Sequence, residues 1–162
     1  MLITSIGQGL LWAPLVIGVF LTFRILNIPD LTTEGSFPLG AAVTISSMLA
    51  GQSAIVASLL GFVAGCLAGW VTGVLDTKLK MPSLLAGILT MTGLYSINMH
   101  IMGKANIPLL DQKTLMGWLP ASWSLNLQTI VIGSVVTLVV LAGLIWLFQT
   151  RLGLSLMATG NN

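Results

Sequence analysis

The chain has 162 residues, of which 56% are hydrophobic and only 6% are charged. A soluble globular domain has about 25% charged residues, so this composition excludes that class and indicates an integral membrane protein. The net charge of +2 is small and scattered, with no basic run for phosphate contacts, which argues against nucleic acid as a partner. At roughly 20 residues per span, we expect an all-α polytopic membrane protein with about five membrane segments.

The first apolar run covers residues 6–26 and is expected to span the bilayer. Pro14 lies in its middle and predicts a kink in the helix. Arg24 lies near its end, where the long side chain can reach the membrane interface.

Residues 27–40 form a polar interruption after this span. Pro29 and Pro38 each remove a backbone donor and oppose a continuous helix. We expect Ser36 to cap a helix that runs to Ala50 and rises only about 21 Å, short of a hydrocarbon core of roughly 30 Å. The segment therefore predicts a discontinuous membrane helix, which is tolerated only beside protein or a water-filled cavity and often marks a transport path.

Two carboxylates, Asp30 and Glu34, lie four residues apart in this polar segment. On one helix face they would repel each other, but together they could bind a cation or a substrate amine, or one of them could be protonated. The other interpretation is that both lie at a wet interface and only solvate a loop. The residues alone leave these alternatives open.

Residues 54–75 form the next apolar run, and its glycines carry the strongest packing signal in the chain. Gly61, Gly65, Gly69 and Gly73 recur every four residues, so they form one slowly drifting stripe on a helix. Glycines at this spacing let a second backbone approach closely. The stripe is either an intramolecular helix contact or a dimerisation face, and in both cases we expect it to be buried.

The run 84–102 is the next expected span, after a short charged loop that contains Lys78 and Lys80. Its second half is polar, which indicates interhelical hydrogen bonds. His100 has either a structural or interfacial role, or a role in substrate contact or proton transfer. A metal site is not expected, because the chain has no second histidine and its one cysteine, Cys66, is not close in sequence.

The connection 103–126 is the longest polar one, and its Trp118 and Trp123 suit the bilayer surface. The last span is expected over residues 127–148. If the broken segment counts as one crossing and the loop with Lys78 and Lys80 is cytoplasmic, four basic residues lie on the cytoplasmic side and two on the outer side. The basic residues therefore favour that orientation.

The sequence lacks the motifs GxxxxGK[ST], HExxH and GxSxG, which mark nucleotide-binding proteins, metalloproteases and esterases. Any ATP-driven work therefore needs a partner subunit, and we expect no enzymatic activity and no cofactor. A Ser/His intramembrane hydrolase with His100 as its base is an alternative, but no serine has a recognisable nucleophile context.

Three segments, taken together in this order, resemble a known family: PDLTTEGSFPLGAA after the first span, PSLLAGILTMTGLYSINMHIMGKANIPLL, and TRLGLSLMATGNN after the last span. Together they resemble the permease subunits of bacterial ABC importers of the branched-chain amino acid and ribose type, especially the amino-acid subgroup associated with tryptophan or tyrosine systems. The resemblance covers most of the chain. Family members form a membrane dimer, pair with two cytoplasmic ATPase subunits and receive substrate from an extracytoplasmic binding protein.

The resemblance implies two sets of functional residues. The family's segment along the central path corresponds here to Asp30, Leu31, Thr32, Glu34, Gly35, Ser36 and Gly40. The family's cytoplasmic segment that docks on the ATPase corresponds to Arg151, Gly153, Leu154, Ser155, Ala158, Thr159, Gly160 and Asn161. Met157 departs from the pattern, which usually has a basic residue before Ala-Thr-Gly, and relatives continue beyond Asn162. We therefore expect residues 1–162 to form a single transmembrane permease domain that is truncated at its C-terminus.

The resemblance thus implies a multi-pass permease subunit of a bacterial inner membrane. It would provide part of the translocation path for a small polar solute, such as an amino acid, with a separate ATPase as the source of energy. The competing interpretation is a non-transporting membrane scaffold, a degenerate permease fragment whose glycine stripe only packs helices. Stable association with a nucleotide-binding subunit would favour the first interpretation.

Overall fold

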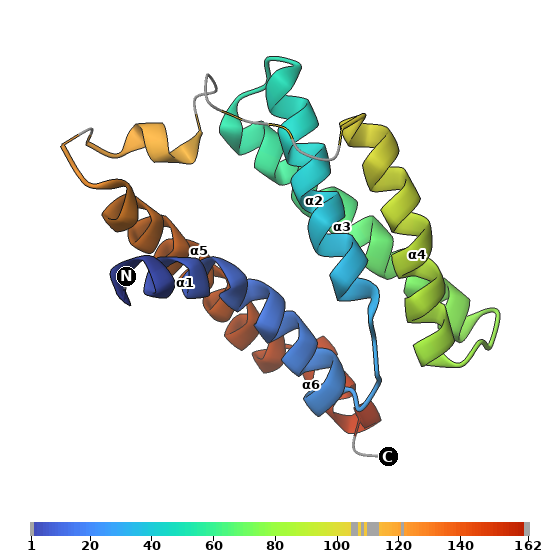
Figure 1. The fold of residues 1–162 in the computed structure, drawn as a ribbon. Helices are drawn as coiled ribbons and strands as arrows, with labels where there is room; N and C mark the ends of the chain where they lie inside the picture. The colour runs from blue at the N-terminus through green and yellow to red at the C-terminus, as the bar shows by residue number, and fades with distance from the viewer. Residues whose placement is uncertain (1, 105–106, 108, 110–113, 121, 161–162) are drawn as a thin grey trace. The chain divides into compact units, whose positions relative to one another are not determined.

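The computed structural model describes residues 2–104, 107, 109, 114–120 and 122–160, and the regular elements among them are all helices. The elements are α1 (Leu2–Phe20), the π-helical turn η1 (Leu21–Ile25), α2 (Thr32–Leu49), α3 (Ala54–Thr77), α4 (Ser83–Met102), the 3-10 helix η2 (Leu115–Trp118), α5 (Leu125–Gln149) and α6 (Arg151–Gly160). Figure 1 shows them in chain order. The predicted all-α fold is confirmed.

Within the described part of the chain, four helical segments are long and apolar enough to cross a membrane: Ile3–Ile25, α3, α4 and α5. They coincide closely with the four apolar runs that the sequence predicted. The fifth long helix, α2, has 18 residues and rises about 27 Å. It is more polar than the others, because it carries Glu34 and six hydroxyl side chains. The protein is therefore a polytopic helical membrane protein.

The chain packs as two compact units. The first unit comprises Met1–Ile28 together with Leu115–Asn162, and the second comprises Pro29–Thr114. The first unit contains α1, η1, η2, α5 and α6, whereas α2, α3 and α4 form the second. In each unit, glycines and threonine hydroxyls lie at the contacts between helices.

In the first unit, α1 and α5 pack where Pro14 interrupts α1. Pro14 has no N–H to donate to the Leu10 carbonyl, so that acceptor loses its helical partner. Thr137 on α5 replaces it: its Oγ1 donates to the Leu10 oxygen at 3.1 Å. One turn away, Gly133 is buried, and a Cβ there would lie only 2.9 Å from the Leu10 Cβ. The neighbouring helix thus satisfies the backbone group that the proline frees.

A tight turn at Thr150 joins α5 to α6. Thr150 ends α5 with an extended backbone, and its Oγ1 accepts a hydrogen bond from the Gly153 amide at 3.4 Å. A Cβ on Gly153 would overlap the Leu147 oxygen and the Phe148 Cα. Only glycine lets the first turn of α6 lie this close to the end of α5.

The predicted break lies at residues 26–31, between η1 and α2. Asn27 ends the first helix in a left-handed conformation (φ 54°), which asparagine adopts more readily than most residues. Asp30 Oδ1 then accepts a hydrogen bond from the Thr32 amide at 2.8 Å and satisfies one of the free amides at the start of α2. The prediction that Ser36 caps this helix is wrong, because α2 already begins at Thr32, one turn before Ser36.

In the second unit, α2 contacts both α3 and α4, as Figure 1 shows. Gly35 brings α2 onto α4, since a Cβ there would lie 2.9 Å from the Met91 Cα. Gly40 and Gly61 bring α2 onto α3, since a Cβ on Gly61 would lie 2.6 Å from the Gly40 oxygen. A small apolar core is formed by Leu39, Ala68 and Leu94.

Three buried threonines join the helices of the second unit at one point. Thr32 Oγ1 on α2 lies 2.8 Å from Thr72 Oγ1 on α3, and Thr72 Oγ1 donates to Thr90 Oγ1 on α4 at 2.9 Å. Hydrogen bonds between helices in a membrane are each worth about 0.6 kcal/mol. The chain of hydroxyls therefore contributes modestly to stability and fixes the register of the three helices.

The predicted glycine stripe on α3 is only partly buried. Gly61 packs against α2, whereas a Cβ at Gly65, Gly69 or Gly73 would meet nothing within 4 Å. Gly69 and Gly73 are exposed. The described residues therefore do not bury the whole stripe, and the prediction that they do is wrong. The cause is helix periodicity, because each step of four residues turns the stripe by about 40°. The dimerisation face stays a prediction.

Candidate functional site: a groove between two helices

A groove of about 470 Å³ lies between α2 and α4. It is lined by Glu34, Gly35 and Pro38 of α2 and by Met91, Thr92, Tyr95, Asn98, Met99 and Met102 of α4. We refer to it as the α2–α4 groove. Its volume falls in the range of roughly 300–1,000 Å³ that is typical of small-molecule sites.

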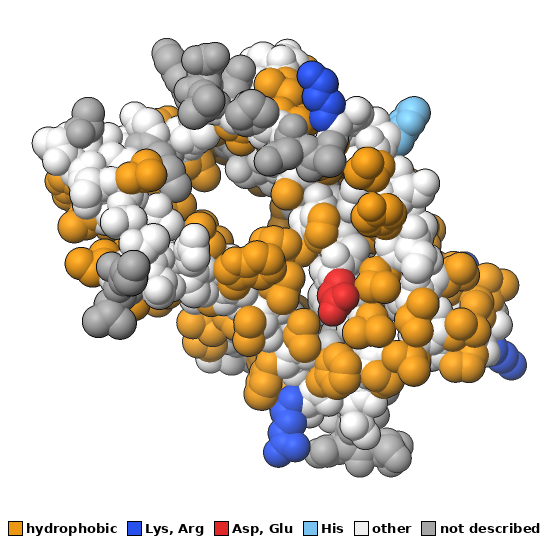
Figure 2. All heavy atoms as spheres, in the orientation of Figure 1, with side chains coloured by type: hydrophobic (Ala, Val, Ile, Leu, Met, Phe, Trp, Pro, Cys, Tyr) orange, Lys and Arg blue, Asp and Glu red, His pale blue; other side chains and the backbone are white. Residues whose placement is uncertain are grey.

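Among the residues that the structure describes, Glu34 is the only charged one that lines the α2–α4 groove. It lies in the first turn of α2, and its side chain is exposed. Pro38, one turn further on, has no N–H to donate to the Glu34 backbone carbonyl, so that carbonyl lacks its usual helical partner. Figure 2 shows acidic atoms surrounded by hydrophobic side chains on the visible face. The groove thus places a carboxylate among largely apolar lining residues.

Asn98 is the buried polar residue of the groove, with 8% of its surface exposed. Its Nδ2 donates to the Gly35 oxygen at 3.4 Å, and its Oδ1 is buried without a hydrogen-bond partner. Because the Gly35 oxygen can only accept, Nδ2 must be the amide atom that faces it. Asn98 Oδ1 therefore lies beneath the surface of the groove.

Two further polar side chains line the groove on α4. Thr92 Oγ1 donates to the Ile88 and Leu89 oxygens, each at 3.0 Å, so its one hydrogen stays within its own helix. Tyr95 is 71% exposed and presents both an aromatic ring and a hydroxyl group. Met91, Met99 and Met102 supply flexible apolar walls that adapt to a ligand's shape.

The residues that the sequence predicted for the substrate path do not all meet in this groove. Glu34 and Gly35 line it. Ser36 is half-buried and donates to the Thr33 oxygen at 3.5 Å. Gly40 faces α3 rather than α4, because a Cβ there would lie 3.3 Å from the Gly61 oxygen.

Asp30 and Thr32 have structural partners instead. Asp30 caps α2, and it lies near Gly87 of α4, where a Cβ would come 3.1 Å from Asp30 Oδ1. Thr32 is 2% exposed and is hydrogen-bonded to Thr72. In this conformation, neither side chain lines the α2–α4 groove.

The lining of α4 was not recognised from the sequence as part of a site. The predicted interhelical hydrogen bonds are present at Thr90 and Asn98, but the methionines were not singled out. A signal does exist, because Met91, Tyr95, Asn98 and Met102 recur at i, i+4, i+7 and i+11. This spacing places them on one face of a helix.

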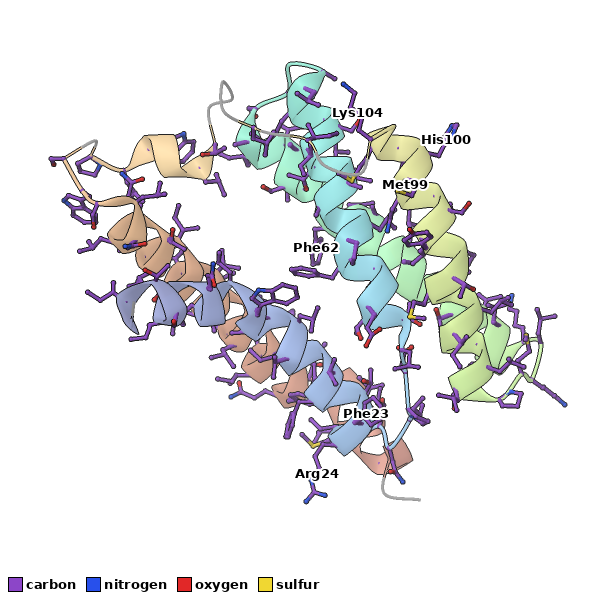
Figure 3. All side chains as sticks on the ribbon, viewed as in Figure 1. Phe23, Arg24, Phe62, Met99, His100 and Lys104 are labelled. Atoms are coloured by element: carbon purple, nitrogen blue, oxygen red, sulfur yellow. The ribbon has the colours of Figure 1, made fainter. Side chains whose placement is uncertain are left out.

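His100 lies in the last turn of α4 and is exposed. Figure 3 shows it projecting from the side of α4 away from α2, whereas Met99 lies on the side nearer α2. His100 therefore does not line the α2–α4 groove. Within the part of the chain that the structure describes, no group of three His, Cys, Asp or Glu side chains could hold a metal ion.

The predicted ATPase-docking segment forms the short helix α6. Arg151, Ser155 and Ala158 are exposed on it, as are the apolar Leu154 and Met157. Gly153 instead packs against the end of α5. The helix ends at Gly160, and Asn161 lies outside the described residues.

Residues 1–162 match the family model described as branched-chain amino acid transport system, permease component. The chain is 45% identical over 114 residues to a tyrosine transport system permease protein of Clostridioides difficile (strain R20291). The matched segment covers 70% of this chain and 39% of that protein. This chain is also 36% identical over 162 residues to an uncharacterised protein of Rickettsia prowazekii (strain Madrid E). That match covers 99% of this chain and 55% of that protein.

The chain thus spans 39% and 55% of the lengths of these two curated relatives. No solved structure matches it.

Proposed function

Because the chain belongs to the family of branched-chain amino acid transport permease components, we propose that it forms part of the translocation path of an ATP-driven importer for a small polar solute such as an amino acid. As a permease it is a transporter subunit rather than an enzyme. Residues 1–162 act as a single transmembrane permease domain of a bacterial inner membrane, and further chain or a further subunit completes the path.

The observation that carries this proposal is the α2–α4 groove. The Glu34 carboxylate lies there, close to the buried Asn98, in a membrane protein whose other lining residues are largely apolar. Polar groups inside a membrane are costly and usually serve substrates or ions. Irregular backbone beside a cavity, such as the break at residues 26–31, is a common feature of transport paths.

The relative's printed name supports an amino acid as the solute. It is described as a tyrosine transport system permease protein and is 45% identical to this chain over 114 residues. The Tyr95 ring and the three methionines of the groove suit an aromatic side chain, since sulfur and aromatic rings make favourable contacts.

Three partners follow from the proposal. A cytoplasmic ATPase docks on α6, where Arg151 offers a charge and Leu154 and Met157 offer exposed apolar surface on a helix that the Thr150 turn holds against α5. A second permease subunit packs against the open part of the α3 stripe, at Gly65 and Gly69. An extracytoplasmic binding protein delivers the solute.

Transport by the complete importer tests the proposal. The permease is co-expressed with its ATPase and binding protein and reconstituted into vesicles, and ATP-dependent tyrosine uptake is measured. We expect Glu34→Gln to lower the uptake rate about tenfold, because a charge-assisted hydrogen bond is worth roughly 1.5–3 kcal/mol. Asp76→Asn makes the same change of charge outside the groove and should retain wild-type uptake.

Equal uptake by the Glu34→Gln and wild-type importers would remove the groove from the path. Failure of any ATPase to co-purify with the permease in mild detergent would instead favour the non-transporting scaffold.

A further inference from the structure

A second groove, between α3 and α4, lies over the apolar core of the second unit. Its volume is about 470 Å³, and the buried Leu39, Ala68 and Leu94 form its floor. Leu67 of α3 and Ile97 of α4 line it and are exposed, so its rim is open to the surroundings. We refer to it as the α3–α4 groove.

The described residues that line the α3–α4 groove give it an apolar surface. Apart from Thr90 and Gly93, they are all aliphatic. Thr90 is buried, and its Oγ1 accepts a hydrogen bond from Thr72. A Cβ on Gly93 would meet nothing within 4 Å, so this glycine leaves one stretch of the wall open. Such walls suit a ligand made of hydrocarbon.

The dimensions of the groove suit a slender chain. On α3 it runs from Ala64 to Leu75, which rises about 16 Å. That length is about half of a hydrocarbon core of roughly 30 Å, the depth of one leaflet. The groove volume, spread over this length, leaves a cross-section of about 30 Å², whereas a helix of about 10 Å diameter fills roughly 80 Å². The groove therefore fits a single acyl chain better than a helix of a second subunit.

A lysine lies just beyond one end of the groove, on the same face of α3. Lys78 continues the helical backbone of α3, and its amide donates to the Val74 oxygen at 2.9 Å. At 3.6 residues per turn, Lys78 lies about 20° from Val71 and about 60° from Leu75 around the helix axis, and both of these line the groove. The Lys78 side chain is exposed and can meet a phosphate group at the mouth of the groove.

Two further charges lie near Lys78 in the sequence. Asp76 lies about 160° from Lys78 around the axis of α3, on the face away from the groove. Lys80 is exposed in the loop that follows and adds a second positive charge at this end of the unit. In the orientation that the basic residues favour, this end meets the cytoplasmic leaflet, where anionic lipids attract basic segments.

We propose that the α3–α4 groove binds one acyl chain of an anionic phospholipid, whose headgroup phosphate pairs with Lys78. The proposal goes beyond the proposed function and does not depend on it. Gly65 and Gly69 lie about 120° and 160° from Val71 around α3, so the lipid leaves the glycine stripe open to a second subunit.

Lipid binding by the purified full chain tests the headgroup contact. Native mass spectrometry measures the affinity of the first bound lipid, with phosphatidylglycerol and phosphatidylcholine of the same acyl chains. We expect the wild-type chain to bind phosphatidylglycerol about fivefold more tightly, and Lys78→Gln to remove this preference. Lys104→Gln removes the same charge beyond the other end of α4 and should retain the preference.

A side chain placed in the groove tests the acyl-chain contact. Gly93→Leu should lower the affinity for both lipids about tenfold, because the leucine displaces methylene groups that would otherwise be buried. Gly9→Leu on α1 is the matched control, since a Cβ there also meets nothing within 4 Å and the residue lies outside the groove. Circular dichroism should show wild-type helix content for both variants.

Photo-crosslinking locates the lipid without any substitution. A phosphatidylglycerol with a photoreactive group in its acyl chain is bound to the wild-type chain, and the modified peptides are identified by mass spectrometry. We expect the first lipid to modify residues 64–75 of α3 and 89–101 of α4.

Equal affinities of the wild-type chain for the two lipids would overturn the headgroup contact, as would a preference that Lys104→Gln removes and Lys78→Gln retains. Wild-type affinities for Gly93→Leu, or crosslinks outside both segments, would place the acyl chain elsewhere. A disulfide-linked dimer of Leu67→Cys in a Cys66→Ser background would put a second copy of the chain in the groove instead.

Discussion

At the scale of single residues, glycines decide how closely these helices approach. Gly35, Gly61 and Gly133 are buried, and at each a Cβ would lie under 3.0 Å from an atom of the facing helix. Gly69 has nothing within 4 Å of the same position. Two glycines of the same α3 stripe, Gly61 and Gly69, can therefore have opposite effects on stability when they are replaced by alanine.

We predict opposite signs for alanine at two positions of the α3 stripe. Gly61→Ala should lower the free energy of unfolding by about 1–3 kcal/mol, because the new methyl group overlaps α2. Gly69→Ala should raise it by roughly 0.5–1 kcal/mol, because alanine is the better helix former and meets no neighbour. Unfolding of the purified chain in mixed detergent micelles measures both. A loss of stability for Gly69→Ala would reveal a partner packed on the open stripe.

The sequence predicted part of the site at this scale. It placed Glu34 among the candidate residues of the substrate path, and Glu34 lines the α2–α4 groove, but it grouped Glu34 with Asp30 and Thr32 because all three lie in one polar segment. Their side chains diverge, since Asp30 caps α2 and Thr32 bonds to Thr72. Helix capping and interhelical bonding depend on where a helix begins and on which helix faces it, and neither is encoded in the local spacing.

At the scale of helices, apolar run length predicted the spans well, because a hydrocarbon core demands long apolar helices whatever their partners are. The prolines predicted a break, and one occurs at Pro29. Pro38 was expected near the start of a helix that begins at Ser36, and it lies further inside α2, because α2 already begins at Thr32. Its missing N–H leaves the Glu34 carbonyl without its usual helical donor. The free-energy cost of a proline in a helix thus depends on whether the carbonyl that it leaves without a helical donor finds another partner.

Pro14 and Thr137 provide a test of this principle in α1 and α5. Thr137→Val should lower the free energy of unfolding by about 1 kcal/mol, because the Leu10 carbonyl loses its remaining partner. In a Pro14→Ala background, residue 14 regains an N–H for that carbonyl, and the cost of Thr137→Val should fall to near zero. A double-mutant cycle in detergent micelles measures this coupling.

The control for this cycle is Thr129→Val, since the Thr129 hydroxyl donates only to the Leu125 oxygen of its own helix, at 2.9 Å. Equal costs of Thr137→Val in both backgrounds would show that the hydroxyl does not compensate for the proline.

At the scale of the whole molecule, the chain presents much apolar surface. Phe62, Trp70 and Trp146 are each at least 66% exposed, and Figure 2 shows hydrophobic side chains spread over the visible face. In water such a surface would aggregate, but lipid tails and the helices of other subunits can cover it. The sequence predicted this class from composition alone. It could not tell lipid-facing positions from subunit-facing ones, because both favour apolar side chains.

The orientation of the molecule in the bilayer is the last prediction. If α2 counts as one crossing, the loop between α3 and α4 and the ends of η1 and α5 lie on the same side. Arg24, Lys78, Lys80 and Arg151 then lie together, against Lys104 and Lys113, of which Lys113 is outside the described residues. The excess of basic residues places the four on the cytoplasmic side.

Cysteine labelling in intact cells tests this orientation in a Cys66→Ser background. A cysteine at Lys80 should react with a membrane-impermeant maleimide only after the membrane is opened, whereas a cysteine at Trp118, which is 73% exposed, should react from outside. Labelling of both positions from outside would mean that α4, the helix between them, does not cross the membrane. Labelling at position 80 alone would invert the molecule and would place α6 away from any cytoplasmic ATPase.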